Sequence, residues 1–317
     1  MIDGILDGIL DVSGRRACMN RCAFCFSKSR IIAEWAPILK KIDDLLSIGA
    51  TRFHIEGTDA CEWDRLPELI DYLKNKGIHH IGLGTHGRTL KDPKFVQRLK
   101  DTGVVESINI PLYGSVESIH NGIVQSRKGS PGNAFQDTIQ GIKNCVEIGI
   151  PIRGHTGLTQ SNKEDISNIL KLYVSLTQGK VESIDIVPLF VLLPFKLYIR
   201  KWILPTKDMG PYLREAYNNF PPGIRITIQQ VPYCVFGSYS SVIDSRVLIA
   251  PDESSKSRKF FPGTTIINTP TESSKHVAGY RRKSYFEECS HCTLKQQCVG
   301  LPSYELRLFG SSGLKAL

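Results

Sequence analysis

The sequence predicts an α/β fold built on a parallel sheet, and two observations carry that prediction. Segments with apolar residues at helical spacing alternate with short apolar segments typical of strands. A glycine also follows directly after four of the helical segments, at Gly49, Gly77, Gly103 and Gly149. Glycine is favoured there because it adopts the left-handed conformation that satisfies the last helical carbonyls. Strands that alternate with helices of this length imply parallel pairing with right-handed crossovers.

The expected elements follow one another through the first two-thirds of the chain. Strands are expected near residues 5–12, 52–56, 80–84, 107–112, 150–153 and 184–190. Helices are expected at 33–48, 66–76, 93–102, 134–148, 165–176 and 206–219. Thr206 is a suitable N-cap for the last of them. This pattern gives about six strand–helix units, which is short of the eight of a closed barrel.

Length and composition describe an ordinary globular protein. The chain has 317 residues, 41% hydrophobic and 22% charged, enough for one large domain and a smaller one. It begins with an acidic stretch where a secretory leader would be basic, so we expect a cytoplasmic protein. Its nine cysteines are then more typical of metal ligands than of disulfides. The apolar stretch 187–205 is broken by prolines and cations, so no membrane span is expected.

The net charge of +9 indicates some attraction to anions. The Lys and Arg residues are scattered, with only short clusters such as residues 281–283, and no recognised nucleic-acid-binding motif accompanies them. A solvated basic surface is the favoured interpretation. A nucleic acid stays among the alternative partners.

Three cysteines near the N-terminus form the most informative motif. Cys18, Cys22 and Cys25 are separated by three and then two residues, and Phe24 stands directly before the last of them. This spacing lets one tight loop surround a single metal centre. Three thiolates are one short of the four that usually hold an iron–sulfur cube, so one iron would be open to a small molecule. A zinc site is the alternative, although zinc modules usually pair two CxxC-type half-sites.

This motif resembles the signature of the radical S-adenosylmethionine (SAM) family, CxxxCxxC with an aromatic residue before the last cysteine. The resemblance implies that Cys18, Cys22 and Cys25 hold a [4Fe–4S] cluster whose fourth iron binds SAM. An external donor such as flavodoxin or ferredoxin would supply one electron, and SAM cleavage would give a 5′-deoxyadenosyl radical that abstracts hydrogen from substrate. The family fold is a partial (β/α)6 TIM-like barrel, which agrees with about six units. The cysteine loop follows the first strand, at the edge where parallel barrels gather their chemistry.

The stretch Gly57-Thr58-Asp59 occupies the place of the Gly-Gly-Glu-type motif with which the family binds the SAM amino group. Asp59 aligns best with the family glutamate, and Glu56 is the alternative. A carboxylate suits this task because an ammonium group needs charge-assisted acceptors. The alternative interpretation is an aspartate that caps the next turn.

Other SAM contacts are implied by the resemblance at the ends of later strands. His86, in a Thr-His-Gly stretch similar to the family's Thr-Asn-Gly, would line the pocket. Ser115 would contact the SAM carboxylate or ribose. Arg153 and His155 would reach the same groups, while the alternative for His155 is a buried polar residue without a catalytic role.

A second cysteine cluster lies near the C-terminus, at Cys289, Cys292 and Cys298, with the isolated Cys234 as a fourth ligand. It resembles the Twitch or SPASM-like extension of many radical SAM enzymes, which carries an auxiliary [4Fe–4S] cluster. A structural zinc site is the alternative, because the two ligand sets overlap. We therefore expect a barrel domain over residues 1–222 and a small cysteine-rich domain over 223–317.

The leading functional hypothesis is a radical SAM enzyme of the oxidoreductase or maturase type. Its substrate would be a ribosomally made peptide, which it modifies, or a small metabolite, which it oxidises. A tRNA or nucleotide substrate is a further alternative that rests on charge. A non-catalytic zinc or iron–sulfur protein, acting as an interaction module or electron carrier, is the alternative from another class.

Overall fold

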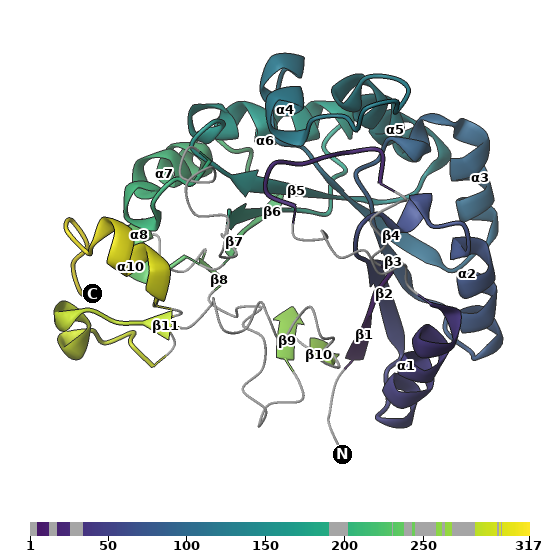
Figure 1. The fold of residues 1–317 in the computed structure, drawn as a ribbon, viewed down its shortest axis with the longest axis horizontal. Coiled ribbons are helices and arrows are strands. Elements are labelled where there is room, and N and C mark those ends of the chain that lie inside the picture. The colour runs from purple at the N-terminus through teal and green to yellow at the C-terminus, as the bar shows by residue number, and fades with distance from the viewer. Residues whose placement is uncertain are drawn as a thin grey trace.

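A single curved sheet forms the centre of the computed structural model (Figure 1). The structure describes residues 5–12, 18–25, 34–189, 202–229, 231–237, 243–244, 258–261, 264–267, 283–296, 298 and 300–317. The strand order in the sheet is β8-β7-β6-β5-β4-β3-β2-β1-β10-β9. Neighbours from β1 to β8 pair in parallel, β10 pairs in parallel with β1, and β9 is antiparallel to β10. The parallel α/β partial barrel predicted from the sequence is confirmed.

The bounds of the elements are as follows. The strands of the large sheet are β1 Ile5–Asp11, β2 Arg52–Glu56, β3 Ile81–Gly84, β4 Val105–Pro111, β5 Ile152–Leu158, β6 Ser183–Pro188, β7 Arg225–Gln229, β8 Ile243–Asp244, β9 Arg258–Phe261 and β10 Thr264–Ile267. The helices of this part are α1 Trp35–Ser47, α2 Leu66–Asn75, α3 Pro93–Asp101, α4 Glu117–Val124, α5 Ala134–Ile148, α6 Ile166–Leu176, α7 Gly210–Asn218 and α8 Tyr233–Phe236. Short 3₁₀ turns are η1 Ala60–Glu62, η2 Thr89–Lys91, η3 Lys163–Asp165 and η4 Thr206–Asp208. No helix within these described ranges is long and apolar enough to cross a bilayer.

Helices α1 to α7 cover the convex side of the sheet and not its concave side, as Figure 1 shows. Alternation along the strands explains this arrangement, because successive side chains point to opposite faces. Ile108 and Ile110 of β4, and Ile184 and Ile186 of β6, are buried in the main apolar core beneath the helices. The residues between them, including Asn109, therefore face the concave side.

The predicted helix ends are confirmed at the four glycines. Gly49, Gly77, Gly103 and Gly149 have φ of 93°, 84°, 72° and 82°, the left-handed region that glycine adopts without strain. At the end of α5 the Gly149 amide donates to the carbonyl of Cys145 at 2.9 Å. Local patterns of spacing and termination therefore place the helices correctly.

The structure adds elements that the sequence did not predict. The short helix α4 was missed, and β7 follows the sixth predicted unit and extends the sheet by pairing with β6. Residues 252–276 were interpreted as a loop, yet β9 and β10 lie within them and join the sheet beside β1. The rest of that stretch, and residues 190–201 of the apolar run, lie outside the described residues.

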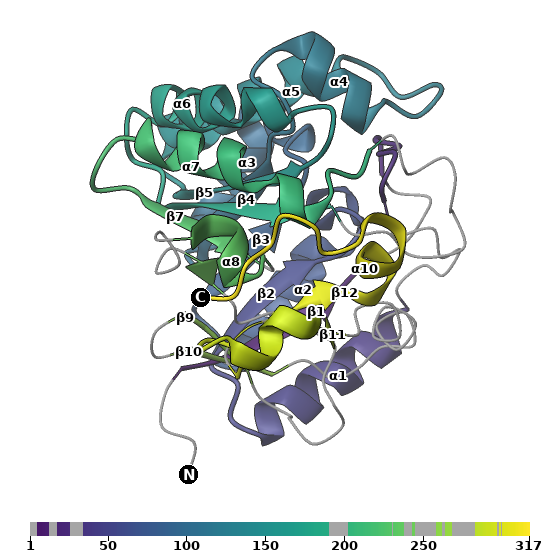
Figure 2. The same ribbon diagram turned by 90° about the vertical axis from the view of Figure 1, so that its left-hand side faces the viewer.

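The C-terminal elements lie near the β7 and β8 end of the sheet, beside α8 (Figures 1 and 2). They are β11 Lys283–Ser284, η6 Glu287–His291, β12 Leu301–Pro302 and α10 Ser303–Phe309, with β11 and β12 paired antiparallel. Helix α10 packs back on the half-barrel, where Tyr304 contacts Ile203 in a small apolar cluster. The buried Glu305 also accepts the Thr206 amide N–H at 2.9 Å. One polar and one apolar contact thus tie α10 to the segment before α7.

Candidate cofactor site

The cysteine loop 18–25 follows β1 in the chain. Backbone hydrogen bonds pair it with residues 123–126. The Arg21 amide donates to the Gln125 carbonyl at 2.7 Å, and the Ala23 amide donates to the Ile123 carbonyl at 3.2 Å. An isolated antiparallel bridge joins Asn20 to Ser126 in the same stretch. The end of α4 and the residues after it therefore give the loop a strand-like partner.

Two buried charged side chains fix the loop at Met19. Oε2 of Glu62, in η1 after β2, accepts the Met19 amide N–H at 2.8 Å. Nη1 of Arg88, in the segment between β3 and η2, donates to the Met19 carbonyl at 3.3 Å and to Oδ1 of Asn20 at 2.9 Å. The Arg88 side chain is fully buried, and its Nη2 donates to the Pro131 carbonyl at 2.6 Å. Charge-assisted bonds in a buried site hold a loop more firmly than neutral ones.

The three predicted cysteines are brought together. Burial raises the pKa of the Cys22 thiol, and the neighbouring Cys25 and Cys18 raise it further. The Cys25 amide donates to the Cys22 carbonyl at 3.1 Å, closing the turn between them, and the Asn20 amide donates to the Cys18 sulfur at 3.4 Å. All three are free thiols. Crowded thiols that resist ionisation suit a cationic centre, because a bound metal removes their mutual repulsion.

Asp59 is buried and its carboxylate is occupied by protein donors. Thr85 Oγ1 donates to it at 2.8 Å, and the amides of His86 and Glu62 donate at 2.7 and 3.1 Å. It therefore caps η1 and ties β2 to β3, which is the capping alternative considered above. Gly57 and Thr58, predicted beside it as SAM contacts, lie more exposed at the end of β2. The role of all three toward SAM stays a prediction.

His86 lies between carboxylates and the cysteine loop. Its Nε2 is 3.2 Å from Oδ2 of Asp59 and 2.6 Å from Oε1 of Glu62. Burial lowers the pKa of His86, but Asp59, Cys18 and Glu62 together outweigh it and raise the pKa to about 10. The Arg88 amide donates to Nδ1 at 3.1 Å, so that nitrogen keeps its lone pair. Full protonation of the ring would break this hydrogen bond, so the bond favours the proton on Nε2.

Of the predicted SAM contacts Phe24 and Ser115, only Phe24 packs beside the cysteines. The Phe24 ring lies 5.0 Å from the Tyr113 ring, centroid to centroid, and both belong to a small apolar cluster with Cys22. The hydroxyl of Ser115 donates to Asp165 at 2.6 Å, and its amide donates to the same carboxylate at 2.6 Å. Phe24 therefore lies beside the cysteines, whereas Ser115 is already engaged in ordering the start of α6.

Arg153 and His155 lie within β5, on the concave face of the sheet. Arg153 is the second residue of β5, and its Nε donates to Glu182 at 2.8 Å, just before β6. It therefore sits at the N-terminal edge of the sheet, opposite the edge that carries the cysteines. His155 is two residues further on, and burial lowers its pKa to about 4, so the ring is neutral at pH 7. Arg153 therefore lies away from the cysteine edge, whereas His155 pairs with Pro111, the last residue of β4.

The middle of the concave face carries buried acceptors without partners. Asp185 of β6 lies across from His155 in the sheet register. Burial raises the pKa of Asp185 to about 6, although the Arg225 charge lowers it. Among the described residues, Oδ1 of Asp185 and Oδ1 of Asn109 have no hydrogen-bond partner. A bound molecule with N–H or O–H donors would satisfy both.

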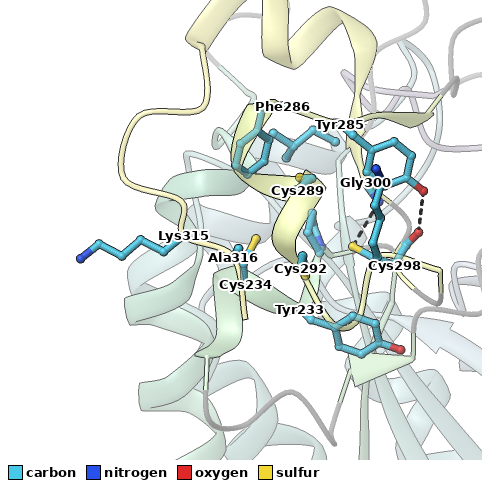
Figure 3. A pocket seen from close by; sticks show the side chains of 13 residues that line it. Tyr233, Cys234, Tyr285, Phe286, Cys289, Cys292, Cys298, Gly300, Lys315 and Ala316 are labelled. Atoms are coloured by element: carbon cyan, nitrogen blue, oxygen red, sulfur yellow. Dashed lines mark hydrogen bonds between the residues drawn. The ribbon is translucent and has the colours of Figure 1, made fainter.

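The four C-terminal cysteines line one pocket. Cys234 comes from α8, and Cys289, Cys292 and Cys298 come from η6 and the turn after it. Figure 3 shows the sulfur atoms of Cys234, Cys289 and Cys298 directed into the space between them, while Lys315 points away. Burial, together with the neighbouring Cys298, Cys289 and Cys292, raises the pKa of Cys234 to about 12. The four thiols predicted as one ligand set are therefore close neighbours.

Backbone donors also reach this second set of sulfurs. The Gly300 amide donates to the Cys298 sulfur at 3.3 Å, and the Tyr285 hydroxyl donates to the Cys298 carbonyl at 3.1 Å (Figure 3). Gly300 has a φ of 64°, and a Cβ there would lie 2.8 Å from the Ser284 carbonyl oxygen. Four thiols with an N–H···S bond fit an iron–sulfur cluster or a zinc ion.

Sequence reasoning missed Glu62 and Arg88 in the first site. Both residues lie close after predicted motifs: Glu62 stands three positions after Asp59, and Arg88 directly follows Gly87. An acidic and a basic residue at the carboxyl ends of neighbouring strands were the available signals. Their contacts with Met19 required the three-dimensional arrangement.

Comparison with known proteins decides the family. The sequence matches the radical SAM superfamily over residues 12–173, just over half of the chain. The chain belongs to the radical SAM superfamily. Members of this superfamily use a [4Fe–4S] cluster and SAM, and the matched range contains the Cys18, Cys22 and Cys25 set. The free, crowded thiols of that loop fit the cluster.

Curated radical SAM relatives resemble part of this chain. A probable GTP 3′,8-cyclase of Methanococcus maripaludis is 28% identical over 138 residues, 42% of this chain and 43% of the relative. An Fe-coproporphyrin III synthase of Methanosarcina barkeri is 28% identical over 162 residues, 50% of this chain and 38% of the relative. The chain thus spans less than half the length of these two curated relatives.

Solved radical SAM structures share the fold over nearly the whole chain. Streptococcus suis SuiB bound to precursor peptide SuiA has a TM-score of 0.59 and 13% identity, covering 99% of this chain and 75% of that chain. The anSMEcpe structure with bound AdoMet has a TM-score of 0.62 and 15% identity, covering 98% and 93%. At these identities the likeness concerns the fold.

Proposed function

We propose that this chain reductively cleaves SAM and abstracts hydrogen from a peptide or a small metabolite. The observation that carries the proposal is the gathering of Cys18, Cys22 and Cys25 at the carboxyl edge of the half-barrel. A cluster bound there would supply the electron that cleaves SAM. The chain's own contribution is to hold the three thiols in a fixed loop and to present the concave face to the substrate.

The residues around the loop support this division of roles. Glu62 and Arg88 hold Met19, so the cysteine loop has a defined path without help from the metal. Phe24 packs on Tyr113 and closes the apolar side of the loop. Gly57 and Thr58 directly follow β2 and remain our proposed contacts for the SAM amino group, since the Asp59 carboxylate already accepts three protein donors.

We assign the C-terminal thiols to an auxiliary [4Fe–4S] cluster. Cys234, Cys289, Cys292 and Cys298 provide four ligands, so no iron would be left open to SAM or substrate. A fully ligated cluster suits electron transfer better than substrate binding. The same thiols fit zinc, which is the second candidate for this site.

Anaerobic reconstitution tests both assignments. About eight irons per chain are expected, four for each [4Fe–4S] cluster. The Cys18→Ala/Cys22→Ala/Cys25→Ala variant should retain about four irons and should form no 5′-deoxyadenosine from SAM under dithionite. The Cys289→Ala/Cys292→Ala/Cys298→Ala variant should also retain about four irons, but in the first site. Nucleoside formation by the first variant would contradict the assignment of the SAM-cleaving cluster to Cys18, Cys22 and Cys25, and tightly bound zinc in the wild type would contradict the auxiliary cluster.

The substrate class follows from the concave face. Asn109 and Asp185 offer buried acceptors, so we propose a substrate that carries N–H or O–H donors. Peptides and polar metabolites both meet this requirement. The names of the two curated relatives refer to a nucleotide and to a porphyrin, which favours the metabolite. Stimulation of 5′-deoxyadenosine formation by the low-molecular-mass fraction of a cell extract would support the metabolite; stimulation that a protease removes would support the peptide.

A further inference from the structure

Two buried polar atoms beside Cys18 lack a hydrogen-bond partner among the described residues. They are Nε2 of His86 and Oε1 of Glu62. The two atoms are 2.6 Å apart, but they are not aligned as a hydrogen bond. The Cys18 sulfur, a ring nitrogen of His86 and a carboxylate oxygen of Glu62 all lie within 4.8 Å of one another. A buried donor without an aligned acceptor is costly, so it calls for an explanation.

The proton on His86 is placed by the hydrogen-bond network. The Arg88 amide donates to Nδ1 at 3.1 Å, so Nδ1 acts as an acceptor. A neutral imidazole with Nδ1 as acceptor carries its proton on Nε2. The imidazolium form also carries a proton on Nε2. Nε2 is therefore an N–H donor whichever form the ring takes.

Each of the two neighbouring carboxylates already accepts a backbone N–H. Oε2 of Glu62 accepts the Met19 amide at 2.8 Å, which fixes the position of the Glu62 side chain. Asp59 accepts from the Thr85 hydroxyl and from the His86 amide. Oε1 of Glu62 and Oδ2 of Asp59 lie 2.6 and 3.2 Å from Nε2, but neither contact is aligned as a hydrogen bond. The Cys18 sulfur is a third acceptor within 4.8 Å of the His86 ring, and it contributes to the raised pKa of His86.

We propose that His86 is a positioning residue that donates its Nε2–H to the Cys18 sulfur once the cluster is bound; the inference rests on the cluster assignment above. An N–H···S bond withdraws electron density from the thiolate, which favours the reduced cluster and raises its reduction potential. The bond also fixes the Cys18 side chain in its ligating orientation. His86, just after β3, would thereby tune the reduction potential of the cluster whose electron begins the reaction.

The test is an EPR-monitored redox titration of the reconstituted full chain. The signal that changes on addition of SAM identifies the cluster of the cysteine loop. We expect His86→Leu, which lacks a donor, to shift the potential of that cluster to a more negative value. His86→Gln keeps an N–H of similar reach and should restore part of the shift. His79→Leu, at an exposed position, is the control and should match the wild type.

Equal potentials for His86→Leu and the wild type, at equal iron content, would overturn the inference. A second measurement does not need the variant to hold its cluster. In wild-type protein labelled with ¹⁵N-histidine, the reduced cluster should couple to one histidine nitrogen, and the absence of that coupling would also overturn the inference. Failure of the wild type to form a cluster on Cys18, Cys22 and Cys25 would instead contradict the proposed function.

Discussion

Glu62 and Arg88 hold the same residue of the cysteine loop, Glu62 through the Met19 amide at 2.8 Å and Arg88 through the Met19 carbonyl at 3.3 Å. The two side chains come from the segments that follow the neighbouring strands β2 and β3. The path of the loop is therefore set by the same sheet that forms the concave face. A shift of one strand against the other would move the thiols, so the geometry of the metal site depends on the packing of the half-barrel.

Arg88→Met should destabilise the chain severely. The Arg88 side chain is fully buried and pairs with Asp137 at 3.2 Å, and removing one partner of a buried pair costs about 3–5 kcal/mol. Lys91→Met is the matched control, because Lys91 pairs with the same carboxylate at 2.9 Å but is 41% exposed. Its loss should cost less than about 1 kcal/mol. Urea unfolding of the reduced, cluster-free protein measures both, and equal costs would contradict the role assigned to burial.

Asp59→Asn separates a structural role from SAM binding. The Asp59 carboxylate accepts from Thr85, from the His86 amide and from the Glu62 amide, and an amide cannot accept all of these bonds. We expect a loss of about 2–3 kcal/mol of stability, since bonds to charged groups are worth about that much. Asp64→Asn, at an exposed position, should change stability by no more than about 0.5 kcal/mol. A variant with normal stability but weak SAM binding would instead make Asp59 the ammonium ligand.

Asp185 should make stability fall as pH rises. Burial raises its pKa from 3.8 to about 6, so the folded chain binds this proton more tightly than the unfolded chain does. The stabilising contribution is complete below pH 3.8 and is lost as pH rises through about 6. The loss is roughly 3 kcal/mol. Asp185→Asn stays neutral, so its advantage over the wild type should grow between pH 4.5 and 7.5, as measured by urea unfolding at several pH values. A constant difference would show that Asp185 does not titrate in this range.

Gly300→Ala should remove the auxiliary metal site and spare the first one. A Cβ at Gly300 would lie 2.8 Å from the Ser284 carbonyl oxygen, and the Gly300 amide donates to the Cys298 sulfur. The reconstituted variant should fall from about eight irons to about four. Gly310→Ala is the matched control, because Gly310 has the same φ of 64° but no atom within 4 Å of its Cβ position. If Gly310→Ala lost the same iron, backbone strain alone would account for the effect.

Much of the fold could be predicted because its signals are local. Helix α5 was predicted with its observed bounds, since its apolar spacing ends at Gly149. Strand β10 could not be found in this way. Its partner is β1, and the pair joins Ile5 to Thr264, so no local pattern records the contact.

The site shows the same division between local and distant signals. Cys18, Cys22 and Cys25 share one short loop, so their spacing alone indicated a common metal centre. Asp59 was predicted as a SAM ligand from its place in a motif, but Thr85 lies 26 residues away and donates to the carboxylate. Arg88 was missed because arginine is rarely fully buried, and nothing in its sequence neighbourhood indicates that it would be.

The position of β1 between β2 and β10 bears on how the protein is made. During synthesis β1 leaves the ribosome first and can pair with β2 early, but its other edge stays bare until residues 264–267 emerge. The arginine, glutamate and strand-like partner that hold the cysteine loop all lie before residue 132 and are available much sooner. We therefore expect the nascent chain to form the cysteine loop, ready to bind metal, while the sheet is still incomplete. At that stage the unpaired edge of β1 is exposed to aggregation, so cluster assembly would have to occur before aggregation does.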